Sequence, residues 1–216
     1  MIGVFLVDDH ELVRTGIKRL IEDQEDFMVL GEASSGEEAM DMLRTFDTLP
    51  QVILMDLNMP GVGGIETTRN VLKRYPDIKV IIVSMIDEGI IPTRVLKAGA
   101  MGYLTKGASM SEMTHGIKEV VAGRRYVSPD IAQKMLSESL DGEKSPFDEL
   151  SERELQVMLM LMDGSRINDI SEKLHLSPKT VSTYRYRIYD KLNINNDMEL
   201  VKMALAHGMM PDTRLQ

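Results

Sequence analysis

Five short apolar runs alternate with helix-forming segments over the first part of the chain, and this alternation limits the fold more than any other feature of the sequence. The apolar runs occupy residues 2–7, 27–33, 51–56, 79–84 and 100–106. Apolar residues repeat with the helical period in the segments between them: 12–24, 36–46, 64–75, 87–98 and 109–123. Strict alternation of this kind predicts a parallel sheet covered by helices on both faces, with right-handed crossovers.

The sequence changes character after this region. Residues 124–149 contain two prolines, several serines and an excess of acidic residues, which predicts a linker over 124–147 with one short helix near 129–139. Residues 151–208 show helical patterns without a strand-like run. We therefore expect an α/β domain over 1–123, followed by the linker and an all-α domain over 148–210.

Composition excludes several classes of protein. The chain contains no cysteine, so disulfides and thiolate metal sites are excluded. No stretch approaches the roughly 18 apolar residues of a membrane helix, and the N-terminus lacks the pattern of a signal peptide, so we expect a cytoplasmic protein that does not contact membranes. The net charge of -9 argues against indiscriminate binding to nucleic acid, although it permits a local basic face.

Reactive side chains follow four of the five predicted strands. Asp8 and Asp9 end the first strand, and Asp56, Ser84 and Lys106 end the third, fourth and fifth. Ligands of open parallel sheets bind beyond these strand ends, and carboxylates that converge there repel one another unless a cation neutralises them. Oxygen ligands suit Mg²⁺. The set predicts phosphoryl transfer to Asp56 as the nucleophile.

Each of these residues also has an ordinary interpretation by itself. An aspartate after a strand often caps a helix, and a lysine at a strand end is usually solvated. One matched group from each of four strands favours the phosphoryl-transfer site. The histidines show no metal-ligand spacing and are expected to be surface or packing residues: His10, His115, His175 and His207.

Four stretches of the first domain, VDDHELVRTGI, ILMDLNMPGVGGIE, VIIVS and AGAMGYLTKG, together resemble the receiver domain of two-component response regulators. The resemblance implies a flavodoxin-like sheet with strand order 2-1-3-4-5. It also implies that Asp56 is the phosphorylation site and that Mg²⁺ is held by Asp8, Asp9, Asp56 and the main-chain carbonyl of Asn58. By the same resemblance, Lys106 binds the phosphoryl group, and Ser84 and Tyr103 form a switch pair.

The second domain shows clear helix boundaries. Ser151 and Glu154 form a capping box at the start of its first helix. A short helix over 167–176 precedes a longer helix, which Ser177 caps and Pro178 begins. That longer helix has an apolar face and an opposite polar, basic face; the apolar face comprises Val181, Ile188 and Leu192. A short helix, a tight turn and a polar-basic helix predict a helix-turn-helix, although an ordinary solvated helix is the alternative.

The stretches LSERELQVMLMLMDG and INDISEKLHLSPKTVSTYRYRIYDKLNI resemble the DNA-binding domain of NarL/FixJ (LuxR-type) regulators, and the whole chain is most similar to the GacA/UvrY/LetA group. The resemblance implies that bases are read by Ser182, Thr183 and Tyr186. Candidate phosphate contacts are Lys179, Thr180, Arg185, Arg187 and Lys191. The final helix, about 197–207, is where such domains dimerise on DNA.

These features predict a DNA-binding response regulator and not an enzyme. The expected partners are a sensor histidine kinase or phosphotransfer domain, double-stranded promoter DNA, RNA polymerase and, on activation, a second copy of the chain. The resemblance implies that the protein mainly activates transcription, with small regulatory RNA genes among its targets. The alternative is a phosphatase-like enzyme with an aspartate nucleophile. Enzymes of the haloacid-dehalogenase type carry D-x-D after their first strand, whereas the first strand here ends in Asp8-Asp9.

Overall fold

The structure is a computed structural model that describes residues 1–141 and 145–209. The chain divides into two compact units, and each is described by itself. The first comprises Met1–Met85 and Pro92–Ala132, and the second comprises Ile86–Ile91 and the chain from Gln133 onward. Part of the predicted linker, residues 142–144, and the predicted end of the second domain at residue 210 lie outside the described residues. The domain boundaries stay predictions.

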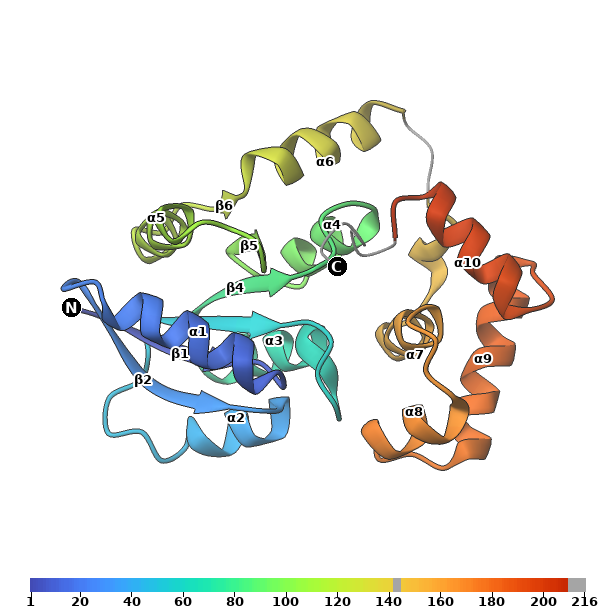
Figure 1. Cartoon of the computed structure of the whole chain (residues 1–216), viewed down its shortest axis with the longest axis horizontal. Helices are drawn as coiled ribbons and strands as arrows, with labels where there is room; N and C mark the ends of the chain where they lie inside the picture. Colours follow the sequence, from blue (N-terminus) through green and yellow to red (C-terminus); the bar gives the residue numbers. More distant parts are fainter. Residues whose placement is uncertain (142–144, 210–216) are drawn as a thin grey trace. The chain divides into compact units, whose positions relative to one another are not determined.

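A parallel sheet with the order β2-β1-β3-β4-β5-β6 forms the centre of the first unit (Figure 1). Its strands are β1 (Ile2–Val7), β2 (Phe27–Ala33), β3 (Val52–Asp56), β4 (Lys79–Ser84), β5 (Gly102–Thr105) and β6 (Tyr126–Val127). The predicted order 2-1-3-4-5 is confirmed for the first five strands. The two-residue strand β6 was not predicted, and its residues were assigned to the linker. A strand this short shows no periodicity in the sequence.

Helices cover both faces of this sheet. They are α1 (Glu11–Glu22), α2 (Gly36–Met42), α3 (Gly63–Arg74), α4 (Ile90–Lys97) and α5 (Met110–Val121). Helices α1 and α5 contact each other over one face, where Leu6, Leu54 and Ile81 contribute to the core. Helices α2 and α3 contact each other, and α2 also contacts the edge strand β2, while α3 contacts β3 and β4. Burial on both faces explains why the central strands β1, β3 and β4 are almost entirely apolar rather than alternating.

The second unit is helical. Its elements are α6 (Pro129–Asp141), the 3₁₀ turn η1 (Pro146–Glu149), α7 (Glu152–Met162), α8 (Ile167–Lys173), α9 (Pro178–Leu192) and α10 (Asp197–Ala206). The first residues of α6 belong to the first unit. No helix in the described part of the chain is long and apolar enough to cross a membrane.

The predicted helix starts of this unit are confirmed, but the short helix predicted over 167–176 ends at Lys173. The Ser151 hydroxyl accepts the Glu154 N–H, and the Glu154 carboxylate accepts the Ser151 N–H at 2.8 Å. Ser177 caps α9 by accepting the N–H of Thr180 at 3.1 Å. The predicted apolar face of α9 is buried against α7 and α8: Val181, Ile188 and Leu192. This packing leaves the opposite face of α9 toward solvent.

Candidate functional site

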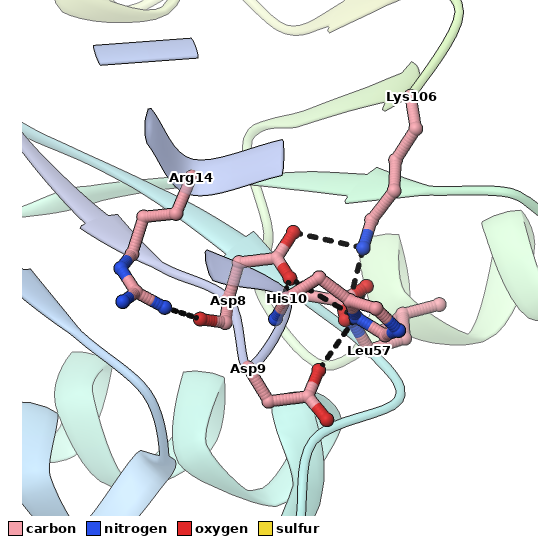
Figure 2. A network of polar contacts seen from close by, with 7 residues as sticks. Asp8, Asp9, His10, Arg14, Leu57 and Lys106 are labelled. Atoms are coloured by element: carbon pink, nitrogen blue, oxygen red, sulfur yellow. Dashed lines mark hydrogen bonds and ion pairs between the residues drawn. The ribbon is translucent and has the colours of Figure 1, made fainter. Parts of the chain in front are cut away.

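Parallel strand register brings the predicted strand-end groups to one edge of the sheet. Val7 pairs with Met55, and Ser84 pairs with Thr105, so the residues that follow these strands emerge side by side. Asp8 and Asp56 are only 5% and 3% exposed. Figure 2 shows the side chains of Asp8, Asp9 and Lys106 grouped around Leu57, the residue that follows β3. The sequence prediction that these groups meet is borne out by this geometry.

The Lys106 ammonium bridges two of the carboxylates. Its Nζ lies 2.8 Å from Oδ2 of Asp8 and 3.2 Å from Oδ2 of Asp56, and its side chain is 9% exposed. The other oxygen of Asp56, Oδ1, accepts the N–H of Leu57 at 2.8 Å. One carboxylate oxygen of Asp56 is therefore fixed by backbone, while Oδ2 points into the pocket.

Burial and charge perturb both partners of this ion pair. Burial raises the pKa of Asp56 from 3.8 to about 6, an effect that Lys106 opposes and Asp8 reinforces. Burial also disfavours the ammonium of Lys106, but Asp56 and Asp8 outweigh that effect and raise the pKa of Lys106 above its ordinary value. At neutral pH the pocket therefore holds a carboxylate at Asp56 and an ammonium at Lys106.

The pocket has the ligand atoms that a divalent cation requires. Ligand atoms of Asp8, Asp9, His10 and Asp56 lie within 4.8 Å of one another. Asp9 Oδ1 is buried without a hydrogen bond, and Asp56 Oδ2 is buried with the Lys106 ammonium at 3.2 Å as its neighbour. Buried carboxylate oxygens without donors are what a hard cation satisfies. Asn58, the fourth predicted ligand, is exposed two residues beyond Asp56, and its role stays a prediction.

His10 and Arg14 also belong to this site, although the sequence pattern predicted no functional role for either. Arg14 donates from a guanidinium nitrogen to the main-chain carbonyl of Asp8 at 2.6 Å. His10 donates its backbone N–H to Oδ1 of Asp8 at 2.8 Å, and its ring nitrogen Nδ1 lies 2.9 Å from Oδ1 of Asp9. The expectation that His10 is a surface residue is incomplete, since its ring is exposed but faces the carboxylates. Its position directly after Asp8-Asp9 was the available signal.

The two residues of the predicted switch pair lie on neighbouring strands. Ser84 ends β4 and is 1% exposed, and Tyr103 on β5 is fully buried. The backbone N–H of Lys106 donates to the carbonyl of Ser84 at 2.8 Å, which links the phosphoryl-binding lysine to the end of β4. The switching role of the pair stays a prediction.

A second candidate site is the solvent face of α9. Lys179, Thr183, Tyr186 and Arg187 are exposed there, and Tyr186 is 71% exposed although it is large and apolar. The Thr183 hydroxyl donates to the carbonyl of Lys179 at 2.9 Å, so it offers acceptor lone pairs and a methyl group outward.

Two of the basic residues predicted to contact phosphate are engaged within the unit. The Arg185 guanidinium is bound by Asp197, with one N–O distance of 2.6 Å, and by the Tyr189 hydroxyl at 2.7 Å. Lys191 Nζ lies 2.7 Å from the carboxylate of Glu154. The charges of Arg185 and Lys191 are therefore already paired with carboxylates inside the unit. Thr180 and Ser182 are only partly exposed.

Comparisons with known proteins agree with this two-part organisation. Residues 4–118 match the family described as response regulator receiver domain. Residues 148–204 match the family described as bacterial regulatory proteins, luxR family. Response regulator GacA of Pseudomonas protegens is 52% identical over 211 residues, 97% of this chain and 98% of that protein. Response regulator UvrY of Escherichia coli is 50% identical over 97% of this chain and 96% of that protein.

Solved structures support the same assignment. A LuxR-family two-component response regulator from Aurantimonas is 38% identical, with a TM-score of 0.60 over 64% of this chain and 97% of that chain. RcsB of Salmonella enterica, solved bound to the promoter rprA, is 24% identical with a TM-score of 0.68 over 94% of this chain and 97% of that chain, and it shows the shared fold. These matches favour a regulator over the phosphatase-like alternative. The chain belongs to the two-component response regulators that join a receiver domain to a LuxR-family regulatory domain, with GacA and UvrY among its relatives.

Proposed function

We propose that this protein is a cytoplasmic transcription regulator whose DNA binding is controlled by phosphorylation of Asp56. The observation that carries the proposal is the position of Asp56, buried at the end of β3 with Oδ2 beside the Lys106 ammonium, in a chain that also contains a helix-turn-helix. The phosphodonor is a phosphohistidine on a sensor kinase or phosphotransfer domain.

Asp56 Oδ2 is the attacking atom in this proposal. It forms a bond to phosphorus as the bond between phosphorus and the donor's imidazole nitrogen breaks, and the imidazole leaves with the electron pair of that bond. Oδ1, which accepts the Leu57 N–H at 2.8 Å, holds the carboxylate in place. The reaction requires an ionised carboxylate, and with a pKa of about 6 Asp56 is ionised at neutral pH.

Mg²⁺ is the cation we assign to the pocket, with Asp8, Asp9, Asp56 and the carbonyl of Asn58 as its protein ligands. When bound, it neutralises the carboxylates and the oxygens of the incoming phosphoryl group. Lys106 already lies between Asp8 and Asp56, so its ammonium reaches a phosphoryl oxygen with little movement. Ser84, on the adjacent strand end, then supplies a hydroxyl to the same group, and Tyr103 completes the switch pair.

On α9, we assign DNA contacts to the exposed residues. The residues that are bound to partners inside the unit hold the helix in position. Of the four cations between 179 and 191, two are bound inside the unit, Arg185 by Asp197 and Lys191 by Glu154. Lys191 is exposed as well, but its ammonium is paired with Glu154, so we assign the phosphate contacts to the exposed Lys179 and Arg187.

Bases are assigned to the centre of the exposed face. Thr183 and Tyr186 lie there, and the acceptor lone pairs and methyl group of Thr183 match the amino groups of cytosine and adenine and the methyl group of thymine. Thr180 and Ser182 are secondary contacts at the edge of this face. Two copies bind together through α10, and promoter-bound protein contacts RNA polymerase to activate transcription, with small regulatory RNA genes as targets.

Phosphorylation is tested on the full chain with acetyl phosphate and Mg²⁺. Intact-mass spectrometry is expected to show one phosphoryl group on the wild type and on Asp77→Asn, a control at an exposed aspartate in the turn before β4. Asp56→Asn is expected to show none. A stoichiometric adduct on Asp56→Asn contradicts the assignment of the acceptor.

DNA binding is tested by selecting sequences from random duplexes with the full chain, with and without phosphodonor. Enrichment of one sequence, with tighter binding by the phosphorylated form, is the expected result. If neither form enriches any duplex sequence, the chain is not a sequence-specific regulator.

A further inference from the structure

The imidazole of His10 is an unexplained part of the acidic pocket. Its Nδ1 lies 2.9 Å from Oδ1 of Asp9 and 3.3 Å from Oδ1 of Asp8. Asp9 Oδ1 accepts no hydrogen bond, so the 2.9 Å contact is an ion pair, and it holds the ring only while the imidazole is protonated. The side chain of His10 is 60% exposed, so packing does not hold the ring against the carboxylates.

These distances match those between neighbouring ligand atoms around a metal ion. Neighbouring ligands of an octahedral ion with bonds of about 2.1 Å are about 3.0 Å apart, and opposite ligands about 4.2 Å. The distances from His10 Nδ1 to Asp9 Oδ1 and Asp8 Oδ1, 2.9 and 3.3 Å, match the spacing of neighbouring ligands. All four candidate atoms, including that of the buried Asp56, lie within 4.8 Å, so a small contraction closes them around one ion.

We infer that His10 is an additional metal ligand, which makes this pocket a site for nitrogen-accepting transition ions as well as for Mg²⁺. The inference deepens the proposed function, because it rests on the same pocket. Mg²⁺ prefers oxygen and retains water molecules, so it gains little from an imidazole. Mn²⁺, Co²⁺, Ni²⁺ and Zn²⁺ accept imidazole together with carboxylates, and Ni²⁺ binds such mixed sites more tightly than Mn²⁺ does. Three aspartates and one histidine therefore favour these ions over Mg²⁺.

The test uses the full chain without an affinity tag and without phosphodonor. Calorimetric titrations with MgCl₂ and NiCl₂ compare the wild type with His10→Ala and with His115→Ala. His115 is the matched control, since it is an exposed histidine on α5 whose ring packs on Tyr126. Pulsed electron paramagnetic resonance of the Mn²⁺ complex reports directly on nitrogen bound to the ion.

Wild type and His115→Ala are expected to show the ¹⁴N coupling of a coordinated imidazole, and His10→Ala is expected to lose it. Because loss of even an outer-shell partner weakens metal binding by about 10–100-fold, Ni²⁺ affinity of His10→Ala should fall by about ten-fold or more. Its Mg²⁺ affinity should stay within about two-fold, since Mg²⁺ does not depend on the imidazole.

Two results separate this inference from the function on which it rests. If the wild type binds Mg²⁺ but His10→Ala keeps the ¹⁴N coupling, or loses no more affinity for Ni²⁺ than for Mg²⁺, His10 is not a ligand. If the wild type binds neither ion, the cation pocket itself is wrong, and the proposed phosphorylation chemistry fails with it.

Discussion

Asp56→Asn is expected to stabilise the metal-free protein, although it removes the residue on which the proposed function depends. Asp56 is a buried carboxylate whose pKa is raised from 3.8 to about 6 chiefly by burial. A raised pKa means that the folded state disfavours the charged form. An amide of the same shape carries no charge, so the substitution removes this unfavourable term.

The size of the effect follows from the pKa values. A difference of about 2.2 between the folded value and 3.8 corresponds to about 3 kcal/mol in the free energy of unfolding. This figure is already net of the attraction by Lys106, which lowers the pKa of Asp56. It is an upper value, because the amide of asparagine places two N–H donors beside the Lys106 ammonium, where the carboxylate had only acceptors.

The dependence on pH has a definite sign. Because the folded pKa of Asp56 lies above the ordinary value, its contribution to stability is fully present below pH 3.8 and is lost as the pH rises through about 6. The wild type should therefore match Asp56→Asn in acid and fall below it above pH 6. Mg²⁺ at about 100 times its dissociation constant should return about 2.7 kcal/mol to the wild type, which nearly closes the gap.

Hydrogen exchange of amides in β3 and β4, measured in EDTA and in Mg²⁺, isolates this unit from the helical one. Asp77→Asn is the control for an uncharged substitution at an exposed site. If Asp56→Asn were equal to or less stable than the wild type in EDTA above pH 6, the burial of an unfavourable charge would be the wrong explanation.

Four further outcomes are expected. Lys106→Ala should accept a phosphoryl group but couple it more weakly to DNA affinity, measured by titrating phosphorylated and unphosphorylated protein on one selected duplex. Arg187→Ala should weaken binding to the selected duplex and to random duplexes equally, and it should reduce the slope of log K against log salt by about 0.9. Thr183→Ala should reduce the binding free energy for the selected duplex by about 1–3 kcal/mol, with little effect on random duplexes and no change in the slope of log K against log salt. Lys191→Ala should destabilise the helical unit by about 1–3 kcal/mol in urea, because Glu154, which is 3% exposed, loses its cation.

The positions of the strand ends could be predicted from the sequence, because the residues at and next to each apolar run determine where the strand ends. Each apolar run ends at the residue where the chain leaves the sheet, and parallel pairing then brings these residues together without further information. Asp8, Asp56 and Lys106 were found in this way. The two-residue strand β6, Tyr126–Val127, could not be found so, because it forms only by pairing with β5.

Residues whose role depends on a distant partner were harder to predict. Arg185 was assigned to phosphate by its place on the helix, but its guanidinium binds Asp197 on the next helix. Lys191 likewise binds Glu154, 37 positions earlier. His10 has no metal-ligand spacing in sequence because its partners include a residue of β3, which only the fold brings close. Charge counts along a helix therefore overstate the basic surface available to DNA.

The burial of Asp56 does not itself drive the switch. Phosphorylation raises the negative charge of the buried site, because an acyl phosphate carries about two negative charges where the carboxylate carries one. A shift from 1:99 to 99:1 needs about 5.5 kcal/mol. In the proposed site this free energy comes from new contacts of the phosphoryl group, for which the Lys106 ammonium and the Ser84 hydroxyl lie nearest. The backbone hydrogen bond from Lys106 to Ser84, at 2.8 Å, makes these two contacts interdependent. Lys106→Ala should therefore leave a partial response rather than none.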